Sequence, residues 1–109
     1  MSKFDEKLAA YETELAKYDS KADNDLLRSV TKGLGPSIYN SDSHLVACSD
    51  KAEVARVVTN YAVKKLGASQ EDGETAVAEV CKAYASNRKH RAVFYYMVCK
   101  KLGKESIYA

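Results

Sequence analysis

The sequence has no long hydrophobic run, and this absence excludes a membrane-spanning helix. None of its apolar segments approaches the roughly 18 to 20 residues that such a helix needs. The chain begins MSKFDEKL, so acidic residues stand where a secretory signal peptide would have its apolar centre. We therefore expect a cytoplasmic protein with no membrane partner.

Cysteine is scarce, and its spacing fits no metal-binding pattern. Cys48, Cys81 and Cys99 are odd in number and include no CxxC pair. We expect all three to be reduced thiols, with Cys81 and Cys99 packed as small apolar residues on helices. The sequence predicts no metal and no other cofactor.

Strand patterns are missing, whereas helical patterns fill the chain. No segment alternates strictly between apolar and polar residues, as a half-buried strand would. Apolar spacings of three and four, capping pairs such as Asp50 with Glu53, and glycine stops predict five helices. The predicted fold is all-α, a compact single-domain bundle over residues 1–109. The helices are expected at about residues 2–18, 50–67, 69–86 and 88–102, with a shorter one that begins at 23 or 24 and ends at 33 or 35, and with an ordered connecting loop over 36–48.

The last predicted helix is the most apolar segment, so we expect it to be the central, most buried one. Its apolar side chains cover well over half of the circumference. What remains polar is a narrow strip, in which Lys89, Tyr96 and Lys100 fall within about 40° of one another and Arg88 flanks them. This strip must face solvent or a partner.

Basic residues crowd the predicted start of that helix, where they oppose the helix dipole. Each cation there costs about 0.3 to 1 kcal/mol unless a phosphate or a carboxylate offsets it. One interpretation is weak nucleic-acid or polyanion binding by Arg88, Lys89, Tyr96 and Lys100, with Tyr96 stacking on a base. The other is a solvated face, or one paired with acids of the same chain.

The charge distribution leaves both interpretations open. The net charge is only +2, which by itself indicates no acidic partner. Residues 1–53 contain 7 Lys/Arg and 10 Asp/Glu, whereas residues 54–109 contain 10 and 5. The acidic first half can therefore supply partners for the basic second half.

Two side-chain pairs raise the question of catalysis. Tyr61 and Lys65 lie one helical turn apart, as Tyr96 and Lys100 do, an arrangement that some dehydrogenases use for proton transfer. However, the chain is too short for a full dinucleotide fold, and the GLGP segment lacks the third glycine. Chance explains such pairs in a chain with 8 tyrosines.

A possible metal site or nucleophile pair begins with His44 and Cys48, which are four residues apart. Few residues remain to complete either site, so we predict no enzymatic activity. The apolar stripe of the first helix is a further candidate, either as a homodimer seam or as a face packed on the protein's own core.

The motif K-x-L-G occurs three times, and each copy follows an apolar helical pattern. A basic last turn, a leucine and a left-handed glycine are a common helix ending, which predicts helix ends at Gly35, Gly67 and Gly103. Two copies continue into Ser-Ile-Tyr, at residues 37–39 and 106–108. Local duplication and chance both explain this second similarity.

The strings KGLGPSIYN at Lys32 to Asn40 and SNRKHRAVFYYMVCKKLGKESIY at Ser86 to Tyr108 are the most distinctive parts of the sequence. Together with the overall length, they resemble a small, uncharacterised bacterial family of unknown function. The resemblance implies a compact helical cytoplasmic protein and no activity, cofactor or ligand. From the residues themselves we expect a non-enzymatic interaction or structural domain, with a second copy or another protein as partner.

Overall fold

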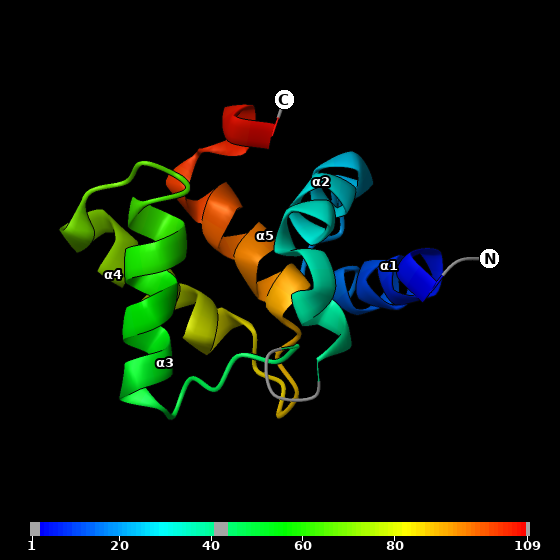
Figure 1. The fold of residues 1–109 in the computed structure, drawn as a ribbon, viewed down its shortest axis with the longest axis horizontal. Helices are drawn as coiled ribbons and strands as arrows, with labels where there is room; N and C mark the ends of the chain where they lie inside the picture. Colours follow the sequence, from blue (N-terminus) through cyan, green and yellow to red (C-terminus); the bar gives the residue numbers. More distant parts are fainter. Residues whose placement is uncertain (1–2, 41–43, 109) are drawn as a thin grey trace.

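The structure, a computed structural model, describes residues 3–40 and 44–108. Over these residues the chain is helical, and its β-structure is one isolated bridge between Leu45 and His90 (Figure 1). The all-α prediction is confirmed. None of the described helices has the length and apolar character that a membrane crossing requires. The elements are α1 (Lys3–Leu15), α2 (Asn24–Leu34), the 3-10 helix η1 (Gly35–Tyr39), α3 (Lys51–Arg56), the π-helix η2 (Val57–Val63), α4 (Gln70–Ala83), α5 (Arg91–Leu102) and the 3-10 helix η3 (Glu105–Tyr108).

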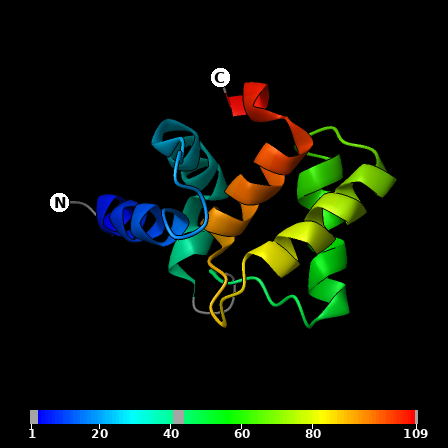
Figure 2. The ribbon, with the colours of Figure 1, turned by 180° about the vertical axis from the view of Figure 1, so that it is seen from behind.

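Helix α5 lies in the middle of the molecule, as the sequence predicts. Helices α1 and α2 pack on one side of it, and α3 and α4 lie on the other (Figure 1, Figure 2). Phe94 and Val98 of α5 are 0% exposed, because neighbouring helices cover α5 on most sides. Burial of such side chains supplies the main favourable term in folding.

Helix α1 packs its apolar stripe onto this core. Leu8, Tyr11 and Leu15 are all buried against the protein's own core, which was one of the two alternatives for this stripe. The helix ends at Leu15, three residues short of the predicted end at Tyr18, and the residues between them form a turn. Ser2, at which this helix is expected to begin, lies outside the described residues.

The third predicted helix begins where expected, but its helical structure ends at Val63 rather than at Gly67, and its second half has a different form. Asp50 caps it, and after Arg56 the backbone continues as the π-helix, in which the Lys64 amide donates to the Thr59 carbonyl five residues back (3.1 Å). Helix α4 approaches this segment closely at Gly73. A Cβ on Gly73 would lie 3.1 Å from the Cβ of Ala62, so a larger residue there would require the two helices to move apart by a few tenths of an ångström.

Two of the three predicted helix ends are confirmed, since Gly35 caps α2 and Gly103 caps α5, whereas the π-helix before Gly67 already ends at Val63. Gly35, Gly67 and Gly103 all have positive φ angles, of 61°, 77° and 65°. The two Ser-Ile-Tyr copies also share a backbone form, because one lies in η1 and the other in η3. Ile38 is buried whereas Ile107 is 45% exposed, so the copies differ in packing.

The prediction of three free thiols is wrong. Cys48 and Cys81 form a disulfide, whereas Cys99 is free and buried as expected. The chain entering α3 passes the end of α4, which brings the two Cα atoms to 5.9 Å, a separation that a disulfide requires. The two residues are 33 positions apart, and no local spacing rule detects such a pair.

The predicted start of the last helix is also wrong, by three residues. Helix α5 begins at Arg91, and His90 is its N-cap. The backbone before it pairs with the loop instead: the Val46 amide donates to the Lys89 carbonyl, and the Arg91 amide donates to the His44 carbonyl, each at 2.8 Å. These tertiary hydrogen bonds hold the segment before Arg91 extended, so the helix begins at Arg91 rather than at Arg88.

Candidate functional site

The four residues predicted to bind a polyanion do not share one helical strip. Arg88 and Lys89 precede α5, so their charges are not on its first turn as expected. Arg88 is exposed. Lys100 lies on α5, with its ammonium 3.7 Å from the carboxylate of Glu105. Anion binding by this set therefore stays a prediction.

Tyr96 is unavailable for stacking on a base. Its side chain is 1% exposed, and its hydroxyl donates to the Asp19 carboxylate at 3.0 Å while accepting from the Asp23 amide at 2.9 Å. Burial raises the pKa of Tyr96 to about 12. The angle of Tyr96 around the helix predicted that it faces solvent, whereas the connection from α1 to α2 covers it. Tyr96 thus holds that connection against α5.

A pocket lies where α2, the π-helix, α5 and η3 meet, and no sequence pattern predicted it. Its volume is ≈ 280 Å³. Aromatic and apolar side chains form most of its wall, one lysine and one asparagine are present, and no acidic residue takes part. We call it the tyrosine pocket, and it is lined by Val30, Gly33, Leu34, Asn60, Tyr61, Lys65, Tyr95 and Tyr108.

Three tyrosines give this pocket a fixed hydrogen-bonded wall. The Tyr61 hydroxyl donates to the backbone carbonyl of Tyr95 at 3.1 Å and accepts from the Tyr108 hydroxyl at 3.0 Å. The rings of Tyr61 and Tyr95 stack, with centroids 4.0 Å apart and planes 21° apart. On the far side, the Arg91 guanidinium donates to the Tyr95 hydroxyl at 2.8 Å.

The phenols of this wall keep their protons at neutral pH. Burial, followed by the hydrogen bond with Tyr108, raises the pKa of Tyr61 far above its ordinary value. Burial likewise raises the pKa of Tyr95 and Tyr108. A general base works best with a pKa near the operating pH, so Tyr61 is unsuited to the proton transfer considered for the Tyr61 and Lys65 pair.

Lys65 supplies the positive charge of the tyrosine pocket. Its ammonium lies 5.5 Å from the centre of the Tyr108 ring, within the range of a cation–π contact. Within residues 3–40 and 44–108, no acidic side chain forms an ion pair with it. Lys65 is exposed, so an incoming anion can reach it.

The π-helix places two of the lining residues, Asn60 and Tyr61. Such helices are rare and are found often at functional sites, because their wider turn redirects side chains. The sequence detected Tyr61 and Lys65 only by their spacing. Tyr95 and Tyr108 join them through tertiary packing, for which the sequence offers no local signal.

The other catalytic candidates are not assembled into sites. Cys48 is in the disulfide and cannot ionise as a nucleophile, while Nδ1 of His44 lies 2.9 Å from the Asn40 carbonyl. Among the described residues, no group of three or more His, Cys, Asp or Glu side chains is arranged to hold a metal ion.

Comparison with known proteins agrees with the resemblance noted in the sequence. No curated protein matches the chain. One family, described as "Protein of unknown function (DUF2853)", matches residues 10–106. This range includes all of α2 to α5 and every residue of the tyrosine pocket except Tyr108. Because the match spans most of the 109 residues, the chain belongs to that family of unknown function.

Proposed function

We propose that this protein is a non-enzymatic binding domain, and that its tyrosine pocket holds a small organic anion such as a carboxylate. One observation carries the proposal: a pocket without any acidic lining residue has Lys65 at its edge, with no ion-pair partner among the described residues. An anionic group near Lys65 would gain a charge-assisted hydrogen bond, and an apolar body would pack on Val30, Leu34 and the Tyr108 ring.

The tyrosine wall favours binding over catalysis. Its hydroxyls hold one another in place and keep their protons, so they can orient a ligand but do not take a proton from it near neutral pH. A largely apolar, pre-formed cavity with a few fixed polar groups is the usual form of a small-molecule site.

The test is a titration with small aromatic and aliphatic carboxylates, and with their neutral amides, followed by amide NMR shifts. We expect the carboxylates to shift residues around Tyr61 and Tyr108 and to bind more tightly than the amides. Lys65→Gln should weaken binding about fivefold or more, because a charged partner is worth about 1.5 to 3 kcal/mol where it is desolvated and less at an exposed position.

Lys64→Gln is the matched control, since it removes the neighbouring exposed charge without touching the pocket. Equal losses in the two variants, or shifts scattered over the surface, would contradict the proposal. Gly33→Ala provides a second variant, because its methyl group would lie 3.8 Å from Cε1 of Tyr108, an ordinary contact that narrows the pocket and leaves the hydroxyls and the Lys65 charge in place.

Polyanion binding through Arg88, Lys89, Tyr96 and Lys100 is the second candidate. It is supported by the basic sequence from Lys82 onward and by the exposure of Arg88. Burial of Tyr96 and the Glu105 carboxylate near Lys100 weaken it. Retention on heparin at low salt that falls steeply between about 50 and 200 mM salt would support it. Absence of retention would remove it.

A protein partner, including a second copy of the chain, and a cytoplasmic location also remain proposals. Light scattering across a concentration series tests self-association, and an unchanging monomer mass would exclude it. For the location, cell fractionation is the test. Disulfides in cytoplasmic proteins are commonly transient, so in that compartment the Cys48–Cys81 bond would be expected to form and break.

A further inference from the structure

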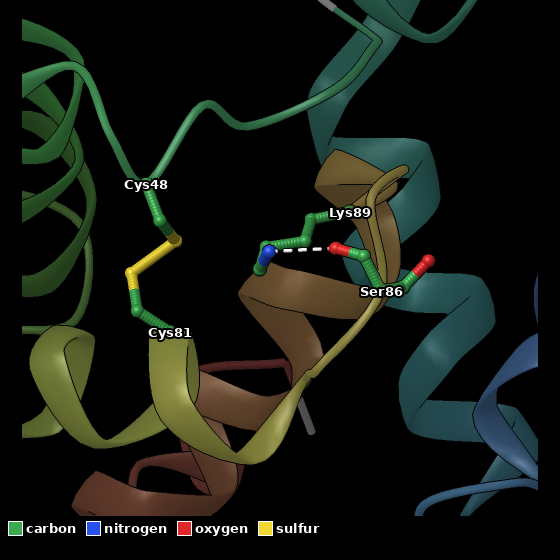
Figure 3. The surroundings of a disulfide bond; sticks show 4 residues. All are labelled: Cys48, Cys81, Ser86 and Lys89. Carbon is green, nitrogen blue, oxygen red and sulfur yellow. Dashed lines mark hydrogen bonds between the residues drawn. A yellow bond between two sulfur atoms is a disulfide. The ribbon is translucent and has the colours of Figure 1, made fainter.

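The Cys48–Cys81 disulfide joins the loop before α3 to the last turn of α4 (Figure 3). Both cysteines are partly exposed. Cys48 also lines an open groove of ≈ 340 Å³ between α3 and α4. The partial exposure of Cys81 leaves that end of the bond open to a thiol reductant, while the groove lies on the Cys48 side.

Lys89 lies beside this disulfide, held there by the backbone (Figure 3). Its carbonyl accepts from the Val46 amide at 2.8 Å, which fixes it next to the loop that carries Cys48. Its ammonium donates to the Ser86 carbonyl at 2.6 Å and forms no ion pair with the acids among the described residues. Lys89 thus adds a partly buried positive charge near the two sulfur atoms.

The two sulfur atoms differ in how well they carry negative charge. Cys81 lies in the last turn of α4, where the negative end of the helix dipole opposes a thiolate. Cys48 lies outside any helix. Cys48 shares the groove with Lys51 and Glu74, and the Asp50 carboxylate nearby accepts from the first amides of α3. Lys82 follows Cys81 in the last turn of α4, where its side chain is exposed to solvent.

We propose that the Cys48–Cys81 bond is a site of thiol–disulfide exchange with a dithiol reductant, with Cys48 as the leaving thiolate beside Lys89. A reductant thiolate attacks Sγ of Cys81, the Sγ–Sγ bond breaks, and its electron pair leaves on Cys48. The second thiolate of the reductant then attacks the mixed disulfide and releases Cys81. The reductant becomes a disulfide, and two electrons and two protons are transferred to the cysteine pair.

This assignment follows from the chemistry of exchange. A sulfur of lower pKa leaves faster, and a nearby lysine lowers the pKa of a thiol. It does not depend on the tyrosine pocket, so either proposal can fail without the other.

The first experiment measures the pKa of the Cys48 thiol in the Cys81→Ser variant, from the pH dependence of alkylation by iodoacetamide. Mass spectrometry of the modified peptide separates Cys48 from the buried Cys99. We expect a midpoint below the ordinary value of about 8.5, rising by about half a pH unit or more when Lys89→Gln is added. Adding Lys64→Gln instead removes a distant charge and should leave the midpoint unchanged. An ordinary midpoint, or one that Lys89→Gln does not move, would overturn the role of Lys89.

The second experiment uses the intact disulfide, so it does not depend on how the variant folds. The protein is treated with glutathione, quenched with acid, and mapped for the mixed disulfide. The adduct is expected on Cys81, and dithiothreitol should reduce the parent several times faster than Lys89→Gln. An adduct found mainly on Cys48 would refute the proposed direction of attack.

Discussion

Glu53 connects α3 to the central helix through its carboxylate. It accepts hydrogen bonds from the guanidinium groups of Arg91 and Arg56, and its side chain is 14% exposed. Burial alone would raise the pKa of Glu53, but the hydrogen bonds and charges of the two arginines outweigh burial and lower it. The ionised form is therefore favoured by folding.

Glu53→Gln should lower the free energy of unfolding by about 1.5 to 3 kcal/mol at pH 7, the usual worth of a hydrogen bond to a charged group. Because the folded pKa lies below the unfolded one, this contribution is complete above about pH 5 and is lost as the pH falls through the folded value. Urea unfolding of both proteins from pH 7 to pH 3 checks it, and the difference should shrink toward acid pH. Glu71→Gln, at an exposed position, should cost about 0.5 kcal/mol or less. A pH-independent difference would contradict the assignment.

Individual side-chain roles were the least predictable level. Asp50 was identified as a cap from its spacing with Glu53, and its carboxylate does accept from the Ala52 and Glu53 amides. Glu53, however, bonds to Arg91, 38 residues away. Tyr96 was assigned to solvent by its angle on the helix, although a segment 73 residues earlier covers it. Such roles depend on distant partners, which spacing does not encode.

At the scale of the elements, α5 is the helix on which the others pack. It contacts α1, α2, α4 and the π-helix. Periodicity predicted its central position correctly, because an apolar surface around most of a helix requires neighbours on most sides. The π-helix was beyond prediction, since valine-rich segments such as Val57–Val63 fit an ordinary helix equally well. Its wide turn accompanies the close approach of Gly73, a tertiary contact.

Phe94→Ala should lower the free energy of unfolding by about 3 to 5 kcal/mol, because it leaves a cavity in the fully buried centre of α5. This is a large share of the total stability of a domain of this size. Thermal and urea denaturation measure it. Ile107→Ala, at a side chain that is 45% exposed, is the control and should change stability little. An unchanged melting temperature for Phe94→Ala would show that α5 is not central.

For the whole molecule, the disulfide is the main covalent constraint among the described residues. It closes a loop across 33 positions that contains α3, the π-helix and most of α4. The class and number of helices followed from composition and periodicity. The disulfide and the tyrosine pocket did not, because each needs segments that are far apart in the chain to meet.

Replacing Cys48 and Cys81 together by serine should lower the free energy of unfolding by about 3 to 4 kcal/mol, from the added entropy of the unfolded chain. For a domain of this size the melting temperature should fall by more than about 10 °C. Calorimetry checks this, and reductant should destabilise the parent by a similar amount without affecting the double variant. Equal stability of the oxidised parent and the double variant would show that the bond does not constrain the chain.

The position of α5 between the two helical pairs also bears on how the protein is made. The α1–α2 pair and the α3–α4 pair both precede α5 in the chain, yet α2 and α4, one helix of each pair, both pack against α5. During synthesis, both pairs therefore emerge from the ribosome with their apolar faces uncovered. The apolar surfaces that pack on α5 are covered only after residues 91–102 have left the exit tunnel, so this packing forms late. Nascent chains that stall before this point should be targets for chaperones and proteases.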